Sequence, residues 1–270
     1  MPELPEVETI RRGLAKSVLH KSISGVMVIN SQPIRGNKNT FANTLKNQKI
    51  EDIGRIGKLL IFKLSGGKYL LIHLKMTGQL IYGKDLPTKY TRVIWNFKDK
   101  SKLYFNDMRK FGYLEIVDQK TKDKIVSKYG IEPLAKNFTL PNFKIAIDKR
   151  KAPIKAVLLN QQLIAGIGNI YADEICFAAE VMPSRPVHKL REEEIKKLYK
   201  SAQKIIKEAI LHGGTTFKDY VNAHGAKGTH TDYLQVYKRA GEKCLRCRKG
   251  IVTVKRVGGR GTHFCPVCQK

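Results

Sequence analysis

The spacing of apolar residues divides the chain into a β-rich first part and a helical second part. Near the N-terminus, apolar residues recur every three or four positions, as one face of a helix requires: Val7, Ile10, Leu14 and Val18. Pro5 precedes most of them, at a place suited to the first turn of a helix. From Ser24 to about Val117 the pattern changes to short runs rich in β-branched and aromatic residues. The sequence therefore predicts one N-terminal helix followed by a β-rich domain.

Four of the short runs predict two β-hairpins. The runs are Leu59–Leu64, Tyr69–Leu74, Val93–Phe97 and Lys102–Phe105. Gly66-Gly67 separates the first two runs and Lys98–Ser101 separates the last two, as turns between strands require. We therefore expect antiparallel pairing within each pair of runs.

Helical patterns replace the strands beyond about residue 141. The predicted helices are Ile154–Asn160, Asn169–Ala179 and Glu192–Leu211. The last of them has one continuous apolar face, which indicates a helix that packs on a core. Residues 217–232 show only weak periodicity and carry Gly and His, which favours a loop that can move.

The balance of charges indicates an anionic partner. The chain has 51 Lys and Arg against 23 Asp and Glu, and its formal net charge of +28 would be self-repulsive without such a partner. No apolar run reaches the length of a membrane span, and neither a secretion signal nor a lipidation motif is present. We therefore expect a soluble cytoplasmic protein that binds nucleic acid rather than a membrane.

Four of the five cysteines form two C-x-x-C pairs near the C-terminus. Cys244 and Cys247 are followed, after 17 intervening residues, by Cys265 and Cys268. This spacing is typical of a site in which four thiolates surround one zinc ion. Four protein ligands leave no open position for a substrate, so we expect one structural Zn²⁺. The fifth cysteine, Cys176, lies in an apolar helical pattern and is expected to be inert.

The residues between the cysteine pairs predict a small hairpin. Ile251–Val257 and Thr262–Phe264 have the character of strands, and Gly258–Gly261 has that of a turn. Residues 236–270 carry ten Lys and Arg and one Glu, so we expect the finger to lie against phosphates. A zinc ribbon more often binds protein or nucleic acid than catalyses a reaction, so the finger alone favours a binding role.

The N-terminus carries an unusual group of acids and prolines. Glu3, Glu6 and Glu8 fall within eight residues of a basic chain, and Pro2 and Pro5 alternate with them. Acids in a first helical turn stabilise the helix dipole, which is one interpretation. The other begins with removal of Met1, which would leave a secondary amine; an α-amino group has an ordinary pKa of about 8, so an appreciable fraction would be neutral at physiological pH. Such an amine is a nucleophile, and nearby carboxylates could transfer protons during its reaction with a sugar.

The segment Pro2–Glu8 resembles the opening of formamidopyrimidine-DNA glycosylases, the oxidised-purine branch of their superfamily. Further motifs resemble that family in the family's order: His73–Gly78, Asp107–Gly112, Gly166–Glu174 and Gly259–Cys265. Together with the four cysteines, these motifs span essentially the whole chain. The resemblance implies an α+β multidomain fold that acts as a monomer on damaged double-stranded DNA.

The resemblance also implies three domains. Residues 1–131 would form a catalytic N-terminal β-sandwich with flanking helices. Residues 132–235 would form a helical domain with a helix-two-turn-helix element at Ala152–Ala179. Residues 236–270 would form the four-cysteine zinc-finger hairpin.

Four residues match catalytic positions of the family. Pro2 would form a Schiff base with the sugar, and Glu3 would donate and accept protons there. Lys58 would assist the elimination that cuts the strand, and Arg260 would clamp the backbone and aid a second elimination. A lone lysine is otherwise most often a solvated charge, and a ribbon arginine would only contact phosphate.

The remaining matches are DNA-binding positions. Met76, Arg109 and Phe111 would fill the gap left by a flipped base, although the two apolar residues alone would be assigned to the core. Phosphate or backbone contacts, or support for them, are implied for six further residues: Glu6, His73, Tyr90, Arg150, Lys155 and Asn169. Among these, Glu6 would position the site, and Asn169 would hold a phosphate at a helix start or serve as an N-cap.

Two segments depart from the family pattern. Tyr90 stands where a histidine is usual, so the contact expected there rests on a phenol. The mobile lesion-recognition loop of the family corresponds to the stretch around His224–Asp232, and it lacks the aromatic residue often found after its second glycine. These departures concern lesion preference more than reaction type.

Three alternatives remain open at this point. A zinc protein that only binds nucleic acid would explain the charge and the finger, but not the N-terminal acids and prolines. An endonuclease VIII-like glycosylase for oxidised pyrimidines would usually differ after the first glutamate. An RNA-associated protein would be expected to show an aromatic binding signature that this sequence lacks.

Overall fold

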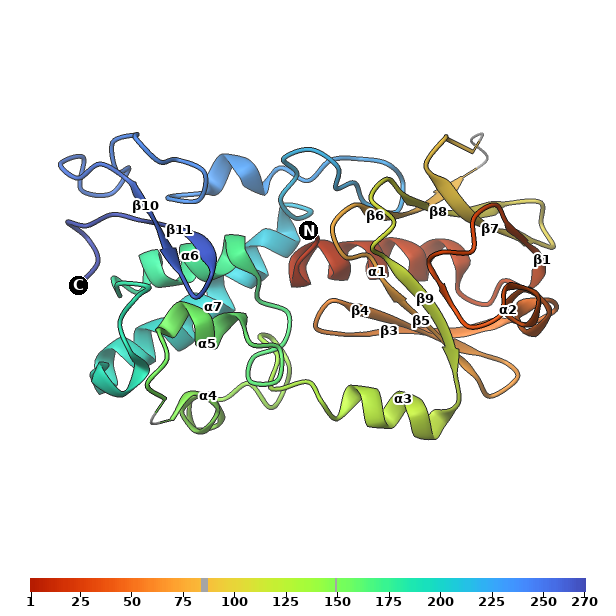
Figure 1. Cartoon of the computed structure of the whole chain (residues 1–270), viewed down its shortest axis with the longest axis horizontal. Helices are drawn as coiled ribbons and strands as arrows, with labels where there is room; N and C mark the ends of the chain where they lie inside the picture. The colour runs from red at the N-terminus through yellow and green to blue at the C-terminus, as the bar shows by residue number, and fades with distance from the viewer. Residues whose placement is uncertain (84–86, 149) are drawn as a thin grey trace. The chain divides into compact units, whose positions relative to one another are not determined.

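The computed structural model describes residues 1–83, 87–148 and 150–270. It divides into two compact units, drawn in Figure 1. Unit 1 comprises residues 1–127 and 212–229, and unit 2 comprises residues 128–211 and 230–270. The segment 212–229 therefore packs with the N-terminal unit, although it follows the longest helix of unit 2 in sequence.

Unit 1 is a sandwich of two sheets. The first sheet has the order β1 (Ile23–Val28), β7 (Thr91–Phe97), β8 (Lys102–Asp107), β6 (Gly78–Gly83). The second has the order β2 (Ile34–Arg35), β9 (Tyr113–Val117), β5 (Tyr69–His73), β4 (Leu59–Leu64), β3 (Ile50–Ile56). The pairs β4–β5 and β7–β8 are antiparallel, which confirms both predicted hairpins. Side chains of both sheets, among them Phe62 and the buried Trp95, share one apolar core.

Helices of unit 1 flank the sandwich. The predicted N-terminal helix is α1 (Leu4–Val18), and all four of its predicted apolar positions are fully buried. The short helix α2 (Lys38–Leu45) was not expected within the β-rich region. Its signals are local, because Asn37 caps its first turn and Phe41 and Leu45 bury one face. A third helix, α3 (Gln119–Val126), has no buried residue.

Unit 2 is helical and ends in a hairpin. The predicted helices are α5 (Ile154–Leu159), α6 (Asn169–Ala178) and α7 (Glu192–Leu211). The sequence interpretation missed α4 (Leu140–Ile147), whose signals are the N-cap Thr139 and a proline in the first turn. Two short 3₁₀ helices, η1 (Val187–Lys189) and η2 (His230–Tyr233), complete the helical part. No helix within the described residues is long and apolar enough to cross a membrane.

The C-terminal hairpin consists of β10 (Thr253–Val257) and β11 (Arg260–Phe264), and β11 packs on α6. Val257 pairs with Arg260, so the turn contains only Gly258 and Gly259. The predicted turn was too long by two residues, because Arg260 and Gly261 already pair in the strand. Before the hairpin, the buried carboxylate of Glu174 accepts backbone N–H groups at three consecutive residues, 235–237, and fixes the entry into the finger.

A fully buried ion pair joins α5, α6 and β11. The Lys155 Nζ lies 2.6 Å from Asp173 Oδ1, and both side chains are 0% exposed. The same ammonium donates to the Gly261 carbonyl at 2.9 Å, while the other Asp173 oxygen accepts the His263 N–H at 2.9 Å. The charges are thus both paired and hydrogen-bonded, which is the condition for burying them. This pair holds the strand that carries Arg260.

A buried carboxylate likewise joins two loops of unit 1. Asp107, at the end of β8, is 0% exposed. It accepts the Thr77 hydroxyl at 2.5 Å in the β5–β6 loop and the Gly112 N–H at 2.7 Å in the β8–β9 loop. The Thr77 oxygen in turn accepts the Arg109 N–H at 3.0 Å. The two loops are therefore held together through one acid.

Replacing Lys155 with methionine is expected to lower the free energy of unfolding of unit 2 by about 3–5 kcal/mol, because it leaves Asp173 buried and uncompensated. The double variant Lys155→Met/Asp173→Leu should recover most of that loss. Urea denaturation followed by circular dichroism measures both. Lys197→Met, which breaks an exposed pair with Glu180, is the matched control and should cost about 1 kcal/mol or less. A single variant no less stable than this control would contradict the role of the pair.

Asp107→Asn is expected to destabilise unit 1 by about 1–3 kcal/mol, since an amide offers only one acceptor oxygen to two donors. Trp95, the single tryptophan of the chain, is buried in this unit and reports its unfolding by fluorescence. Asp123→Asn, at an exposed pair on α3, serves as the control and should change stability by about 0.5 kcal/mol at most. Equal stability of the two variants would show that the Asp107 bonds are dispensable.

Candidate active site and nucleic-acid interface

The N-terminal end of α1 is a closed polar site. Pro2 and Glu3 are buried, and Glu3 is only 2% exposed. The Glu6 carboxylate is 1% exposed and accepts the Glu3 N–H at 2.7 Å and the Thr215 N–H at 2.8 Å. Glu6 therefore holds backbone in place. These two bonds agree with the expectation that Glu6 positions the site.

The segment 212–229 approaches this helix closely. A side chain at Gly214 would place its Cβ 2.9 Å from a Glu6 oxygen, so only glycine allows the approach. The Tyr220 hydroxyl donates to the Gly213 carbonyl at 2.9 Å. Thr215 and Tyr220 are thus supporting residues that sequence reasoning missed. The Gly213-Gly214 pair was the one available signal of a close backbone contact.

Lys58 lies in the two-residue turn between β3 and β4 but is only 6% exposed. A lysine in such a turn is normally solvated, because the ammonium group is strongly hydrated. The interpretation of Lys58 as a solvated charge is therefore wrong.

The three residues predicted to fill the gap of a flipped base lie on the two loops joined by Asp107. Met76 is 39% exposed and Phe111 is 56% exposed, so the alternative that places them in the core is wrong. The Arg109 guanidinium lies 4.9 Å from the centre of the Phe111 ring, a cation–π contact. Two apolar side chains and one cation are thus exposed to solvent on loops that the hydrogen bonds of Asp107 hold together.

His73 ends β5 as a neutral imidazole. Burial and the positive charges of Lys75 and Lys58 lower the pKa of His73 to about 3. The Lys75 N–H donates to its Nδ1 at 3.0 Å, so the ring proton resides on Nε2. His73 can therefore offer one N–H to an acceptor such as a phosphate oxygen, without carrying charge.

Two further predicted contacts lie at the surface. Tyr90 is 37% exposed, and its carbonyl accepts the Asp107 N–H at 2.9 Å. Arg150 is exposed, and its Nε donates to the Ala146 carbonyl at 3.3 Å. Both side chains are accessible to a ligand.

The predicted residues of unit 2 gather where α5, α6 and β11 meet. Asn169 is the first residue of α6, and the N-cap is Gly168, so the N-cap alternative for Asn169 is wrong. Its Nδ2 donates to the Gly261 carbonyl at 3.1 Å, one residue after the exposed Arg260. Lys155, for which the resemblance implies a DNA contact, has its ammonium buried against Asp173.

The stretch predicted as a loop is irregular apart from η2. The side-chain oxygen of Asn222 accepts the N–H groups of His224 and Ala226 at 2.9 and 3.1 Å. Ala223 is fully buried, and its carbonyl accepts the Tyr82 N–H at 2.8 Å. The part of the stretch that belongs to unit 1 is therefore anchored to β6.

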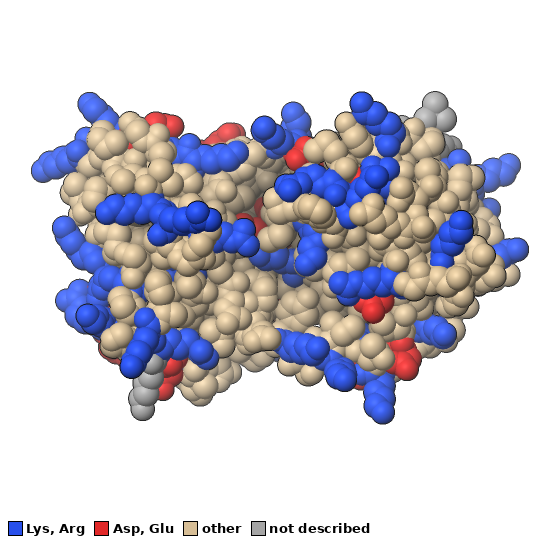
Figure 2. Space-filling view, in the orientation of Figure 1, with Lys and Arg blue, Asp and Glu red and all other residues tan. Residues whose placement is uncertain are grey.

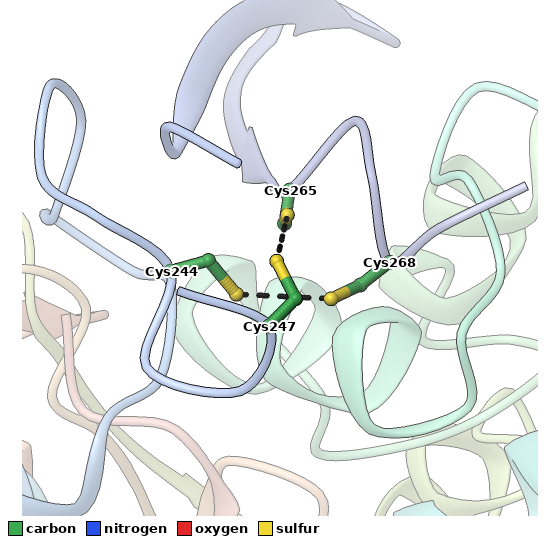
Figure 3. Close-up of side chains that lie close together, drawn as sticks. All are labelled: Cys244, Cys247, Cys265 and Cys268. Carbon is green, nitrogen blue, oxygen red and sulfur yellow. Dashed lines mark hydrogen bonds between the residues drawn. The ribbon is translucent and has the colours of Figure 1, made fainter. Parts of the chain in front are cut away.

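The four predicted ligand cysteines lie together, with their sulfur atoms pointing toward one another (Figure 3). All four Sγ atoms are within 4.8 Å of one another, and the pairs Cys244–Cys268 and Cys247–Cys265 are 3.8 Å apart. Tetrahedral Zn–S bonds of about 2.3 Å place sulfur atoms about 3.8 Å apart. The cluster therefore has the dimensions of a four-thiolate zinc site. Cys176 lies outside it, and burial raises the pKa of its thiol far above the usual range.

Basic side chains dominate the charged surface. On the face drawn in Figure 2, Lys and Arg greatly outnumber Asp and Glu, as the formal net charge of +28 requires. Such a surface attracts phosphate backbones and makes binding sensitive to salt.

Comparison with known proteins identifies the family. Sequence models match the chain as "Formamidopyrimidine-DNA glycosylase N-terminal domain" over residues 1–114, "Formamidopyrimidine-DNA glycosylase H2TH domain" over residues 129–221 and "Zinc finger found in FPG and IleRS" over residues 241–270. Formamidopyrimidine-DNA glycosylases of Pelotomaculum thermopropionicum and Listeria innocua are 42% and 41% identical over 275 residues, covering 100% of this chain and 99% and 100% of the relatives.

Solved structures agree with the sequence relatives. A mutant Lactococcus lactis FPG in complex with a Fapy-dG containing DNA has a TM-score of 0.93 at 35% identity, and both chains are covered completely. The wild-type Lactococcus lactis protein with an oxidised pyrimidine containing DNA has a TM-score of 0.91 at 36% identity, also with complete coverage. The predicted resemblance and fold class are thereby confirmed: the chain belongs to the formamidopyrimidine-DNA glycosylase family.

Proposed function

We propose that this glycosylase removes oxidised purines, namely 8-oxoguanine and formamidopyrimidines, from duplex DNA and then cuts the strand by β,δ-elimination. The observation that carries the proposal is the N-terminal end of α1, where Pro2 and Glu3 are buried together and Glu6 fixes the backbone. The substrate class is supported by the Lactococcus lactis relative, which has been solved with Fapy-dG in its DNA.

The chemistry starts from the amine that removal of Met1 exposes on Pro2. Its nitrogen bonds to C1′ of the sugar, and the base leaves with the electrons of the glycosidic bond and takes up a proton. Glu3 supplies a proton to the ring oxygen as the C1′–O4′ bond opens, which leaves an iminium at C1′. The iminium acidifies the C2′ proton, and its loss expels the 3′ phosphate.

Two cations complete the proposed reaction. Lys58 assists the first elimination from its buried turn, and Arg260 stabilises the phosphate that leaves in the second elimination. An ammonium or guanidinium near a departing phosphate offsets the charge that develops on it. The exposed position of Arg260 at the start of β11 leaves its side chain accessible to DNA.

The three gap-filling residues, Met76, Arg109 and Phe111, would occupy the space of the extruded base. Met76 and Phe111 expose apolar surface to solvent and are not part of the core. The Arg109 guanidinium lies against the Phe111 ring. Filling the gap in the base stack offsets several kcal/mol of lost stacking. We assign phosphate or backbone contacts to four further residues: His73, Tyr90, Arg150 and Asn169.

Zinc is the metal that the four-thiolate cluster would hold. Its role would be structural, because four protein ligands fill a tetrahedral shell. The apolar cluster around the finger is small, so the metal would supply much of the free energy that folds it.

The Schiff base is tested by trapping with borohydride on an 8-oxoguanine:C duplex. The processed protein is expected to form a covalent adduct that depends on the lesion and maps by mass spectrometry to the peptide 2–11. Pro2→Gly should give much less adduct, since it replaces the secondary amine with a primary one. Undamaged duplex, oxidised-pyrimidine duplex and confirmation of Met1 removal are the controls.

Glu3→Gln separates the two halves of the mechanism. It should lose base removal from 8-oxoguanine DNA but still be trapped on a preformed abasic site, because the amine is intact. In one outcome, the fully processed, zinc-loaded protein binds the duplex tightly and still gives no adduct. That result would contradict the proposal for this lesion. An adduct with oxidised pyrimidines alone would favour the endonuclease VIII-like alternative.

Removing the metal should unfold the finger while leaving unit 1 folded. Cys265→Ala is expected to lose zinc and to weaken binding to abasic-analogue DNA by about tenfold or more, since the cations of the finger lose their phosphate contacts. Trp95 fluorescence should stay unchanged. Cys176→Ala is the matched control, and it should keep both zinc and affinity. Full affinity in the zinc-free variant would refute the proposed role of the finger.

A further inference from the structure

An arginine side chain forms a hydrogen bond to the backbone of the turn that carries Lys58. Ile56 pairs with Leu59, so Gly57 and Lys58 are the whole turn, and Gly57 has the positive φ of 55° that such a turn requires. The Arg55 Nη1 donates to the Gly57 carbonyl at 2.9 Å. The Gly57 carbonyl, directly before Lys58, is thus fixed by the side chain of the residue two positions earlier in the chain.

The same arginine reaches helix α1. Its Nε donates to Glu8 Oε2 at 3.1 Å, and the side chains of Arg55 and Glu8 are only 9% and 10% exposed. A planar guanidinium can make both bonds at once with little freedom to move. One rigid group therefore connects the Lys58 turn to α1, five residues after Glu3.

Glu8 is itself held by further arginines. Arg11 donates to both Glu8 oxygens at 2.9 and 2.8 Å, and its Nη1 also donates to the Ile53 carbonyl of β3 at 3.3 Å. Burial acts to raise the pKa of Glu8, but the bonds from Arg11 and Arg12 outweigh it and lower that pKa to about 2. The acid is therefore ionised at any pH at which the enzyme works, and α1 is tied to β3 at two points.

We infer that Glu8 and Arg55 are positioning residues that set the Lys58 ammonium against the reacting sugar at the N-terminal end of α1. The inference rests on the proposed function, because it assumes that Lys58 acts in the elimination. Neither side chain needs to touch DNA. Their effect is to hold the β3–β4 turn in register with the helix that carries Pro2 and Glu3, where a shift of about 1 Å can cost as much as a hundredfold in rate.

The test separates formation of the Schiff base from elimination. Arg55→Lys keeps the charge but cannot bridge Glu8 and the turn in the same plane, and Glu8→Gln keeps the shape but loses the charge. Each variant is mixed in excess with a duplex that has a preformed abasic site. Borohydride trapping at early times measures the imine, and strand cleavage in a single turnover measures elimination.

Both variants are expected to slow elimination by about tenfold or more, while early trapping and affinity for a tetrahydrofuran duplex change by about threefold at most. Arg12→Gln is the matched control, because Arg12 also bonds to Glu8 at 2.8 Å but is 55% exposed. It should cleave within about twofold of the unchanged protein.

Two outcomes would overturn the inference. One is elimination at the normal rate in both variants, and the other is a parallel fall of trapping, affinity and elimination, which would assign the network to folding alone. Failure of the proposed function is distinguishable from both, because the unchanged protein would then give no imine. In that case the inference falls with it.

Discussion

A carboxylate buried in protein is costly unless hydrogen-bond donors replace the water around it. In this chain that requirement is met by backbone N–H groups and one hydroxyl of the segments that carry the predicted site residues. Glu6 fixes Glu3 and Thr215, and Asp107 fixes the two loops that carry Met76, Arg109 and Phe111. Glu174 fixes the entry into the finger. Because each acid must keep all its donors, the segments it joins cannot move independently without exposing a buried charge.

The same constraint explains how a chain with 51 basic and 23 acidic residues remains folded. Several acids are used internally, where each compensates nearby cations or peptide dipoles, as Asp173 and Glu8 do. The surface is left with an excess of Lys and Arg. Among the buried charged side chains, acids outnumber bases, which increases the excess of positive charge at the surface.

Elements with strong local signals could be predicted from the sequence. Helix α1, both hairpins, helices α5–α7 and the four cysteines have periodicity or spacing that leaves little choice. The short helices α2 and α4 were missed because their evidence is a single cap and two or three apolar residues. Turn length at the finger was misjudged because glycine-rich segments permit both strand and turn.

Side chains whose roles depend on distant partners could not be predicted in the same way. Glu6 meets Thr215, 209 positions along the chain, and the burial of Lys155 depends on Asp173 and on β11. The exposure of Met76 and Phe111 could not be predicted either, since an apolar residue type does not reveal whether the side chain points into the core or into solvent. Family resemblance located these residues, but only the structure shows which of them face solvent and which support a neighbour.

The membership of residues 212–229 in unit 1 has a consequence for how the protein is made. The β-sandwich can begin to form as soon as its strands have been synthesised, because its hairpins are local. The N-terminal end of α1 cannot be completed then, since Glu6 still lacks Thr215 and the core still lacks Tyr220 and Ala223. Residues 128–211 of the helical unit must be translated first. During synthesis, the contacts of Thr215 with Glu6 and of Tyr220 and Ala223 with the core can therefore form only after α7 has left the ribosome.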